Sequence, residues 1–173
     1  MRILAIADVE DDLLLSRLSQ PGDLRYDLVI SCGDLGLSYL DAVATLANAP
    51  LAYVRGNHDK GYEDSWEMGG INLDGRIERF GDVRVAGLEG SLDYREGIVG
   101  YSQSEMSRKV VVLGLRAALT GGVDVLVTHA PARGVWGPAG RAASGLRVLQ
   151  RSAYLGASAP HAARACAPQL WRD

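Results

Sequence analysis

Polar side chains that can bind a metal or move a proton stand directly after short apolar runs at four places in this chain. In chain order, they are Asp8 and Glu10 after residues 3–7, Asp34 after residues 28–31, Asn57, His58 and Asp59 after residues 51–54, and His129 after residues 125–128. Open α/β sheets bind ligands outside the carboxyl ends of their strands. If the apolar runs are strands of one fold, these side chains are candidates for a shared site.

Asp8, Asp34, Asn57 and His129 together offer oxygen and nitrogen ligands without a thiolate, a set that suits Mn²⁺, Fe or Zn²⁺. Two cations ~4 Å apart can be held by such a set if one carboxylate, most simply Asp34, bridges them. A metal pair of this kind hydrolyses phosphoesters, because it lowers the pKa of a shared water and neutralises charge on the phosphorus oxygens.

His58 and Asp59 would then lie beside the metals. We expect His58 to act as an acid or a charge stabiliser and Asp59 to fix its tautomer and orientation.

Each of these residues also has an ordinary explanation. Asp8 can cap a helix, Gly33-Asp34 and Gly56-Asn57 can form turns, and His129 can be a hydrogen-bonded core residue. Glu10 can equally be a first-turn acid that a helix dipole favours. No single one of these residues establishes a metal site. Their joint occurrence at strand ends favours one.

The pattern of apolar residues predicts the elements that position these side chains. Strands are expected at residues 1–7, 26–31 and 51–54, with helices between them at 13–18, ended by Pro21-Gly22, and at 38–49. This alternation predicts a parallel sheet. Residues 76–80 and 83–88 form a predicted hairpin, Ser102 and Glu105 a capping box before a helix over 106–119, and residues 123–128 a further strand. We interpret residues 60–74 and 87–100 as loops that contribute to substrate choice.

Composition narrows the class of protein. A chain of 173 residues suits one domain that buries roughly 70% of its unfolded surface. The net charge of −3 provides no general attraction to nucleic acid or to an anionic membrane, and no specific nucleic-acid module is evident. Two cysteines and no visible signal peptide make the cytoplasm the default location. No apolar run approaches the ~20 residues of a membrane span.

With these motifs in hand, the chain resembles the calcineurin-like metallophosphoesterases. Asp8, Gly33-Asp34, Gly56-Asn57-His58-Asp59 and His129 match the successive motifs of that superfamily in order and in strand-end context, over residues 1 to about 134. The resemblance implies an α/β fold of two facing β-sheets flanked by helices. It also implies that Asp34 bridges two metals, that Asn57 and His129 bind the second, and that Arg55 lies near the substrate phosphate.

Two departures from the family pattern stand out. Glu10 occupies the position where the family usually has a metal-binding His, which would favour harder ions such as Mn²⁺ or Mg²⁺. The family's final Gly-His-x-His motif, which normally supplies one ligand to each metal, is absent, and His161 does not reproduce it.

The change in composition after Pro131 suggests a cause for the second departure. We divide the chain into a metallophosphoesterase domain, residues 1–134, and a divergent tail, residues 135–173. If Arg164 to Pro168 is encoded CGG GCA TGC GCA CCC, the frame one nucleotide later reads Gly-His-Ala-His-Pro. Ala143 to Leu146 can likewise be read as His-Arg-Gly-Phe. We therefore hypothesise a frameshift between about Ala132 and Ala143.

The expected function is hydrolysis of a phosphomonoester or phosphodiester, with a small molecule or nucleotide as substrate. Two divalent ions are the expected cofactors, with Mn²⁺ favoured and Fe, Zn²⁺ and Mg²⁺ as alternatives. The alternative is a non-catalytic remnant that binds a metal or a phosphate. The sequence leaves the oligomeric state and the substrate open.

Overall fold

A computed structural model describes residues 1–22, 25–59, 69–92 and 99–130, together with the backbone of residues 164–166. Within these ranges the chain forms two four-stranded sheets, a two-stranded ribbon and three helices.

The first sheet has the strand order β1-β2-β3-β4 and is parallel throughout. Its strands are β1 (Ile3–Ile6), β2 (Leu28–Ser31), β3 (Leu51–Tyr53) and β4 (Ile71–Asn72). Helices α1 (Asp12–Leu18) and α2 (Leu37–Ala47) connect the first three strands. The central strands β2 and β3 are fully buried, as expected for parallel strands covered on both faces.

The second sheet has the order β10-β9-β6-β5. The hairpin of β5 (Ile77–Phe80) and β6 (Val83–Leu88) is its antiparallel part, whereas β9 (Val125–Thr128) pairs in parallel with β6 and with β10 (Arg164–Cys166). Helix α3 (Gln103–Thr120) precedes β9, and the ribbon of β7 (Ser91–Leu92) and β8 (Gly100–Tyr101) lies before it.

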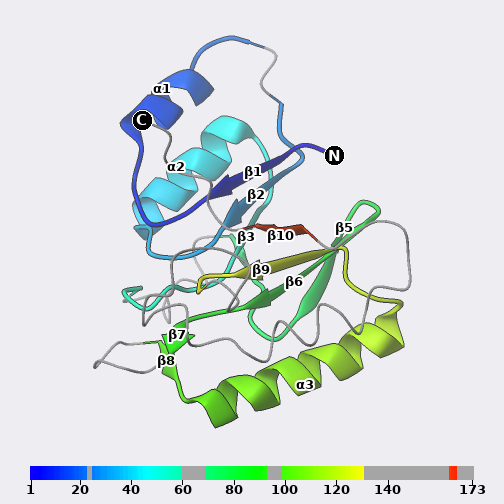
Figure 1. The fold of residues 1–173 in the computed structure, drawn as a ribbon. Helices are drawn as coiled ribbons and strands as arrows, with labels where there is room; N and C mark the ends of the chain where they lie inside the picture. Colours follow the sequence, from blue (N-terminus) through cyan, green and yellow to red (C-terminus); the bar gives the residue numbers. More distant parts are fainter. Residues whose placement is uncertain (23–24, 60–68, 93–98, 131–163, 167–173) are drawn as a thin grey trace.

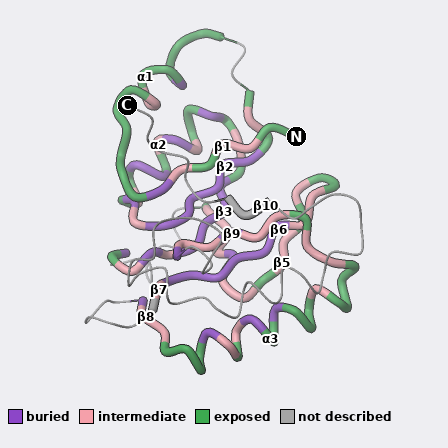
Figure 2. The backbone as a smooth tube through the Cα atoms, viewed as in Figure 1, coloured by how far each residue is buried: buried purple, intermediate pink, exposed green. Residues whose placement is uncertain are grey.

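Three apolar cores join these elements into layers, with α1 and α2 on one side, α3 on the other and the sheets between (Figure 1). Val29 and Tyr53 pack against α1 and α2, whereas Ile30 and Val54 pack between the sheets with Val127. A third core joins the second sheet to α3 through Leu88, Met106, Val110 and Leu113. In Figure 2 the buried segments accordingly include β2, β3 and most of β6, and buried positions recur along α3. The expected arrangement of two facing sheets flanked by helices is confirmed.

Most predicted elements occur within a few residues of their expected bounds. The capping box is present: the Ser102 hydroxyl accepts from the Glu105 backbone, and the Glu105 carboxylate accepts from the Ser102 backbone N–H. Helix α2 ends at Asn48, which is left-handed (φ 48°), slightly before the expected stop at Pro50.

The predicted loops were wrong in part. Residues 71–72 form β4 at the edge of the first sheet, residues 91–92 and 100–101 pair as a ribbon, and the tail contributes β10, where no strand was predicted. These strands have only two or three residues, too few for a periodic pattern, and pairing with longer neighbours places them in the fold. The apolar residues Leu146, Leu149, Ala153 and Leu155 also allow a helix in the tail, but this stretch lies outside the described residues. None of the described helices combines the length and the apolar character that a membrane crossing requires.

Candidate metal centre

The predicted ligands converge on one edge of the two sheets. In the first sheet Ile6 pairs with Ser31 and Ser31 with Tyr53, so Asp8, Asp34 and Asn57 each leave the sheet within a few residues of the same level. His129 directly follows β9 of the second sheet. Because parallel strands direct their carboxyl ends to one edge, residues distant in sequence meet there.

Asp8, Asp34 and His129 form a group able to hold a metal ion, with one ligand atom from each within 4.8 Å of the other two. His129 Nε2 lies 3.6 Å from an Asp34 carboxylate oxygen. Asp8 is exposed, whereas Asp34 and His129 are half-buried. The cluster therefore opens to solvent on the Asp8 side and is anchored in the protein on the other.

The imidazole of His129 is oriented by the backbone. Its Nδ1 lies 2.8 Å from the Cys32 carbonyl oxygen, which can only accept, so Nδ1 carries a hydrogen atom. In the neutral ring Nε2 then presents a lone pair to the Asp34 carboxylate. A backbone carbonyl behind a histidine ring is the arrangement that fixes the tautomer of metal-binding histidines.

The Asn57 side chain faces the other nitrogen of the His129 ring. Its Oδ1 lies 2.9 Å from His129 Nε2. Two acceptor atoms at this distance repel each other unless a hydrogen atom lies between them, on Nε2 or on a turned amide, or unless both bind the same cation. The donor set of two carboxylates, an amide oxygen and an imidazole nitrogen fits a divalent ion of the Mn²⁺, Fe or Zn²⁺ type.

Both carboxylate ligands have unusual backbone conformations. Asp8 (φ 63°) and Asp34 (φ 60°) are left-handed, which only a few per cent of residues other than glycine adopt. Such conformations cost energy and persist where the surrounding structure imposes them, often at functional sites. Here they turn two carboxylates toward one point.

Two glycines let the loops behind the ligands approach closely. A Cβ added to Gly33 would lie 2.4 Å from the Gly56 backbone nitrogen, and one added to Gly56 would lie 2.0 Å from an Asp34 carboxylate oxygen. No larger residue fits at either position without moving the loops. The Gly33-Asp34 and Gly56-Asn57 pairs are thus explained by packing as well as by turn formation.

Asp59 is buried and joins these two loops. Its Oδ2 accepts hydrogen bonds from the backbone N–H of Gly56 (2.7 Å) and of Asp34 (3.0 Å). Burial raises the pKa of the Asp59 carboxyl group above its ordinary value, although these two hydrogen bonds oppose the rise. Among the described residues its carboxylate contacts the backbone and not the His58 ring, so the expected orienting role of Asp59 has no counterpart in these contacts.

His58 and Glu10 lie at the exposed margin of the cluster. The His58 backbone N–H donates to Asp34 Oδ1 (2.9 Å), which helps to orient that carboxylate. Glu10 Oε1 accepts from the Gly36 N–H (3.0 Å) at the start of α2 and does not belong to the group of Asp8, Asp34 and His129. Gly36 has no side chain to cap the helix, and Glu10 supplies the acceptor from a neighbouring loop.

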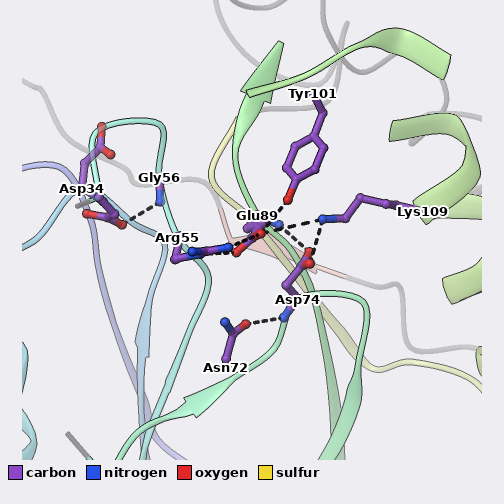
Figure 3. Close-up of polar contacts among 9 residues, drawn as sticks. Asp34, Arg55, Gly56, Asn72, Asp74, Glu89, Tyr101 and Lys109 are labelled. Atoms are coloured by element: carbon purple, nitrogen blue, oxygen red, sulfur yellow. Dashed lines mark hydrogen bonds and ion pairs between the residues drawn. The ribbon is translucent and has the colours of Figure 1, made fainter. Parts of the chain in front are cut away.

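Sequence reasoning missed a second polar cluster, which begins one residue before the Gly56-Asn57 turn (Figure 3). Arg55 Nε and Nη2 donate to the two carboxylate oxygens of Glu89 at 2.7 and 2.8 Å. Tyr101 donates its hydroxyl to the same carboxylate (2.6 Å), and Lys109 pairs with Asp74 (2.7 Å). Glu89 directly follows the apolar strand β6, so the strand-end rule that selected Asp8 and Asp34 would have found it.

Comparisons with known proteins give one structural likeness. No family model matches the chain, and no curated protein matches it. Among solved structures, the chain is similar to a single mutant of Vps29 from Entamoeba histolytica, with 21% identity and a TM-score of 0.41. The match covers 73% of this chain and 62% of that chain, so this chain spans less than two thirds of its length.

Proposed function

We propose that this protein is a metal-dependent phosphoesterase that hydrolyses a phosphomonoester or phosphodiester. The observation that carries the proposal is the convergence of Asp8, Asp34 and His129 within 4.8 Å, with the His129 ring oriented by a backbone carbonyl. In the proposed centre these residues and Asn57 hold the divalent ions, Mn²⁺ by preference. Asp34, whose carboxylate lies 3.6 Å from His129 Nε2, is the proposed bridging ligand.

Bound divalent ions would supply Lewis acidity, which lowers the pKa of water and neutralises charge on phosphate oxygens. The protein's own residues supply the geometry. The Cys32 carbonyl and the His58 N–H orient His129 and Asp34, and Asp59 holds the two loops together. This arrangement limits reorganisation of the ligands when a cation binds.

His58 and Arg55 are the proposed residues on the substrate side. His58 is exposed beside Asp34, so its ring can reach a substrate from solvent as an acid or a charge stabiliser. Arg55 is half-buried next to the same turn and is the proposed cation on the substrate side, while two of its nitrogens donate to Glu89. Asp59 is proposed to act indirectly, by holding the backbone of Gly56 and Asp34 in place.

One observation favours a second candidate, a protein that binds a metal or a phosphate without hydrolysing it. The Glu10 carboxylate accepts a hydrogen bond at the start of α2. The sequence also lacks the Gly-His-x-His motif that supplies further ligands in the family it resembles. A half-built centre would bind its second cation weakly. This candidate predicts one bound Mn²⁺ per chain, whereas the enzyme predicts two.

The test combines Mn²⁺ titration by calorimetry with hydrolysis of p-nitrophenyl phosphate and bis-p-nitrophenyl phosphate. Asp34→Asn removes the proposed bridging charge, and Asp124→Asn is the matched control because that carboxylate pairs with Arg84 elsewhere on the surface. We expect Mn²⁺-dependent turnover in the wild type and the control, and none in Asp34→Asn. Turnover that survives in Asp34→Asn contradicts the proposed centre, and Mn²⁺ binding without turnover favours the second candidate.

A further inference from the structure

Glu89 is a buried carboxylate with an unusual number of charged and polar partners. Its side chain is 2% exposed, and it receives two hydrogen bonds from Arg55 and one from Tyr101. Lys109 Nζ lies 3.9 Å from the same carboxylate and 3.9 Å from the centre of the Tyr101 ring. Arg55 follows β3 of the first sheet and Glu89 follows β6 of the second, so the pair connects the two sheets.

The charge state of Glu89 follows from these contacts. Burial alone raises the pKa of a carboxyl group, but the hydrogen bonds from Arg55 and Tyr101 and the charges of Arg55 and Lys109 outweigh burial here, so the pKa of Glu89 lies below its usual range. A buried ionic network seldom stabilises a fold more than well-packed apolar residues would. In this position its main role is therefore to hold the residues that it contacts in place.

The network is linked directly to the turn that carries Asn57. Beside the side-chain pair, the Gly90 N–H donates to the Arg55 carbonyl oxygen (2.8 Å). Gly90 is itself confined, because a Cβ there would lie 2.6 Å from the Val99 carbonyl oxygen. The residue after Arg55 is Gly56, whose N–H is bound by Asp59. Arg55 is thus fixed through both its side chain and its backbone immediately before the ligand turn.

We infer that Glu89 is a positioning residue for the candidate metal centre. Its carboxylate holds Arg55, and Arg55 holds the Gly56-Asn57 turn at the distance from His129 that cation binding requires. Tyr101 of the β7–β8 ribbon and Lys109 of α3 also contact Glu89, and Lys109 lies on the side away from Arg55 (Figure 3). This inference rests on the proposed function for its purpose, but the mechanical link can be tested without it.

The test is amide hydrogen exchange, followed by NMR, in the metal-free full-length protein. Glu89→Gln keeps the shape of the side chain and removes its charge. We expect exchange at Gly56 and Gly90 to become about tenfold faster, the effect of losing roughly one charged hydrogen bond. The Val29 amide, which donates to Pro50 in the first sheet, should be accelerated less than these two amides. Unchanged exchange at Gly56 and Gly90 overturns the inference.

Further variants separate positioning from loss of the fold. Tyr101→Phe removes only the hydroxyl donor and should accelerate the same two amides less, whereas Asp124→Asn, which breaks an ion pair of the second sheet away from the turn, should leave them unchanged. Equal acceleration at Gly56 and Val29 in Glu89→Gln means general destabilisation and overturns the inference.

A measurement of Mn²⁺ affinity distinguishes failure of the inference from failure of the proposed function. With the turn loosened, the Glu89→Gln variant should bind Mn²⁺ about tenfold more weakly than wild type, a loss typical of residues that orient ligands. Unchanged affinity overturns the positioning role. If the wild type binds no Mn²⁺ while Gly56 and Gly90 exchange faster in the variant, the proposed function fails and the mechanical link stands.

Discussion

At the scale of single residues, the candidate centre shows what a linear pattern can and cannot predict. Asp8, Asp34 and His129 were predicted because each follows an apolar strand, and the structure brings them together. The contacts that fix their side chains involve backbone groups, such as the Cys32 carbonyl behind His129, and no residue type encodes these. The same holds for Glu10, whose partner Gly36 becomes its neighbour only through the fold.

A variant of Glu10 distinguishes its role in capping α2 from a role as a metal ligand. If its main contact is the Gly36 N–H, Glu10→Gln should lower the melting temperature by about 2 °C through weaker capping of α2. Its Mn²⁺ affinity should stay within about twofold of wild type, because no ligand is lost. Thermal unfolding and calorimetry check both outcomes. A loss of affinity of more than about tenfold would instead establish Glu10 as a ligand.

At the scale of elements, helix α3 shows how its two faces differ. Met106, Val110 and Leu113 are buried against the second sheet, whereas Val111, Leu115 and Leu119 are exposed. Apolar spacing predicted the helix, but apolar residues on both faces hide which face packs. The short strands β4 and β10 were missed for a related reason, since two or three residues carry no periodic signal and their pairing partners lie elsewhere in the chain.

The two faces of α3 make a matched pair of variants. Leu113→Ala should lower the free energy of unfolding by about 2 to 4 kcal/mol, because it leaves a cavity between the helix and the sheet. Leu115→Ala makes the same chemical change at an exposed position and should stay within about 0.5 kcal/mol of wild type. Urea unfolding measures both variants, and equal losses would mean that the packed face of α3 is assigned wrongly.

At the scale of the whole molecule, the described parts of the two sheets are joined by an apolar core and by the ionic network around Glu89. The parallel first sheet could be predicted from the alternation of strands and helices, whereas the facing-sheet arrangement was implied by the family resemblance. The network of Arg55, Glu89 and Lys109 could not, because its members lie far apart in sequence and meet only when the sheets face each other. A single carboxylate after a strand does not reveal its partner.

This network predicts how stability depends on pH. Because the pKa of Glu89 in the folded protein lies below its ordinary value of 4.5, its ionised form stabilises the fold above that pH. The contribution should be lost as the pH falls through the lower folded pKa. The difference in unfolding free energy between wild type and Glu89→Gln should therefore shrink as the pH falls below 4.5.

Urea unfolding at several pH values measures this difference. Burial raises the pKa of Asp59, which acts in the opposite direction, but Asp59 is present in both proteins and cancels in the comparison. A difference that grows as the pH falls would contradict the charge state assigned to Glu89.

The position of β10 bears on the tail. Residues 164–166 pair in parallel with β9, so the carboxyl end of β10 lies beside the end of the strand that His129 follows. This is the segment that the shifted reading frame would rewrite as Gly-His-Ala-His. We predict that the gene's codons for Arg164 to Pro168 allow that reading, which nucleotide sequencing checks directly. A chain translated in the shifted frame, with Gly-His-Ala-His at this segment, should then bind two Mn²⁺. Codons that do not allow this reading would contradict the frameshift hypothesis.

The contact between His129 and Cys32 spans 97 positions of the chain. The candidate centre is therefore assembled late, since Asp8, Asp34 and Asn57 share the first sheet while His129 arrives only when β9 docks. Contacts between such distant residues form slowly. A cation that needs all four side chains therefore has no complete binding site until β9 has packed. Mn²⁺ should thus slow the unfolding of the protein while leaving its refolding rate almost unchanged.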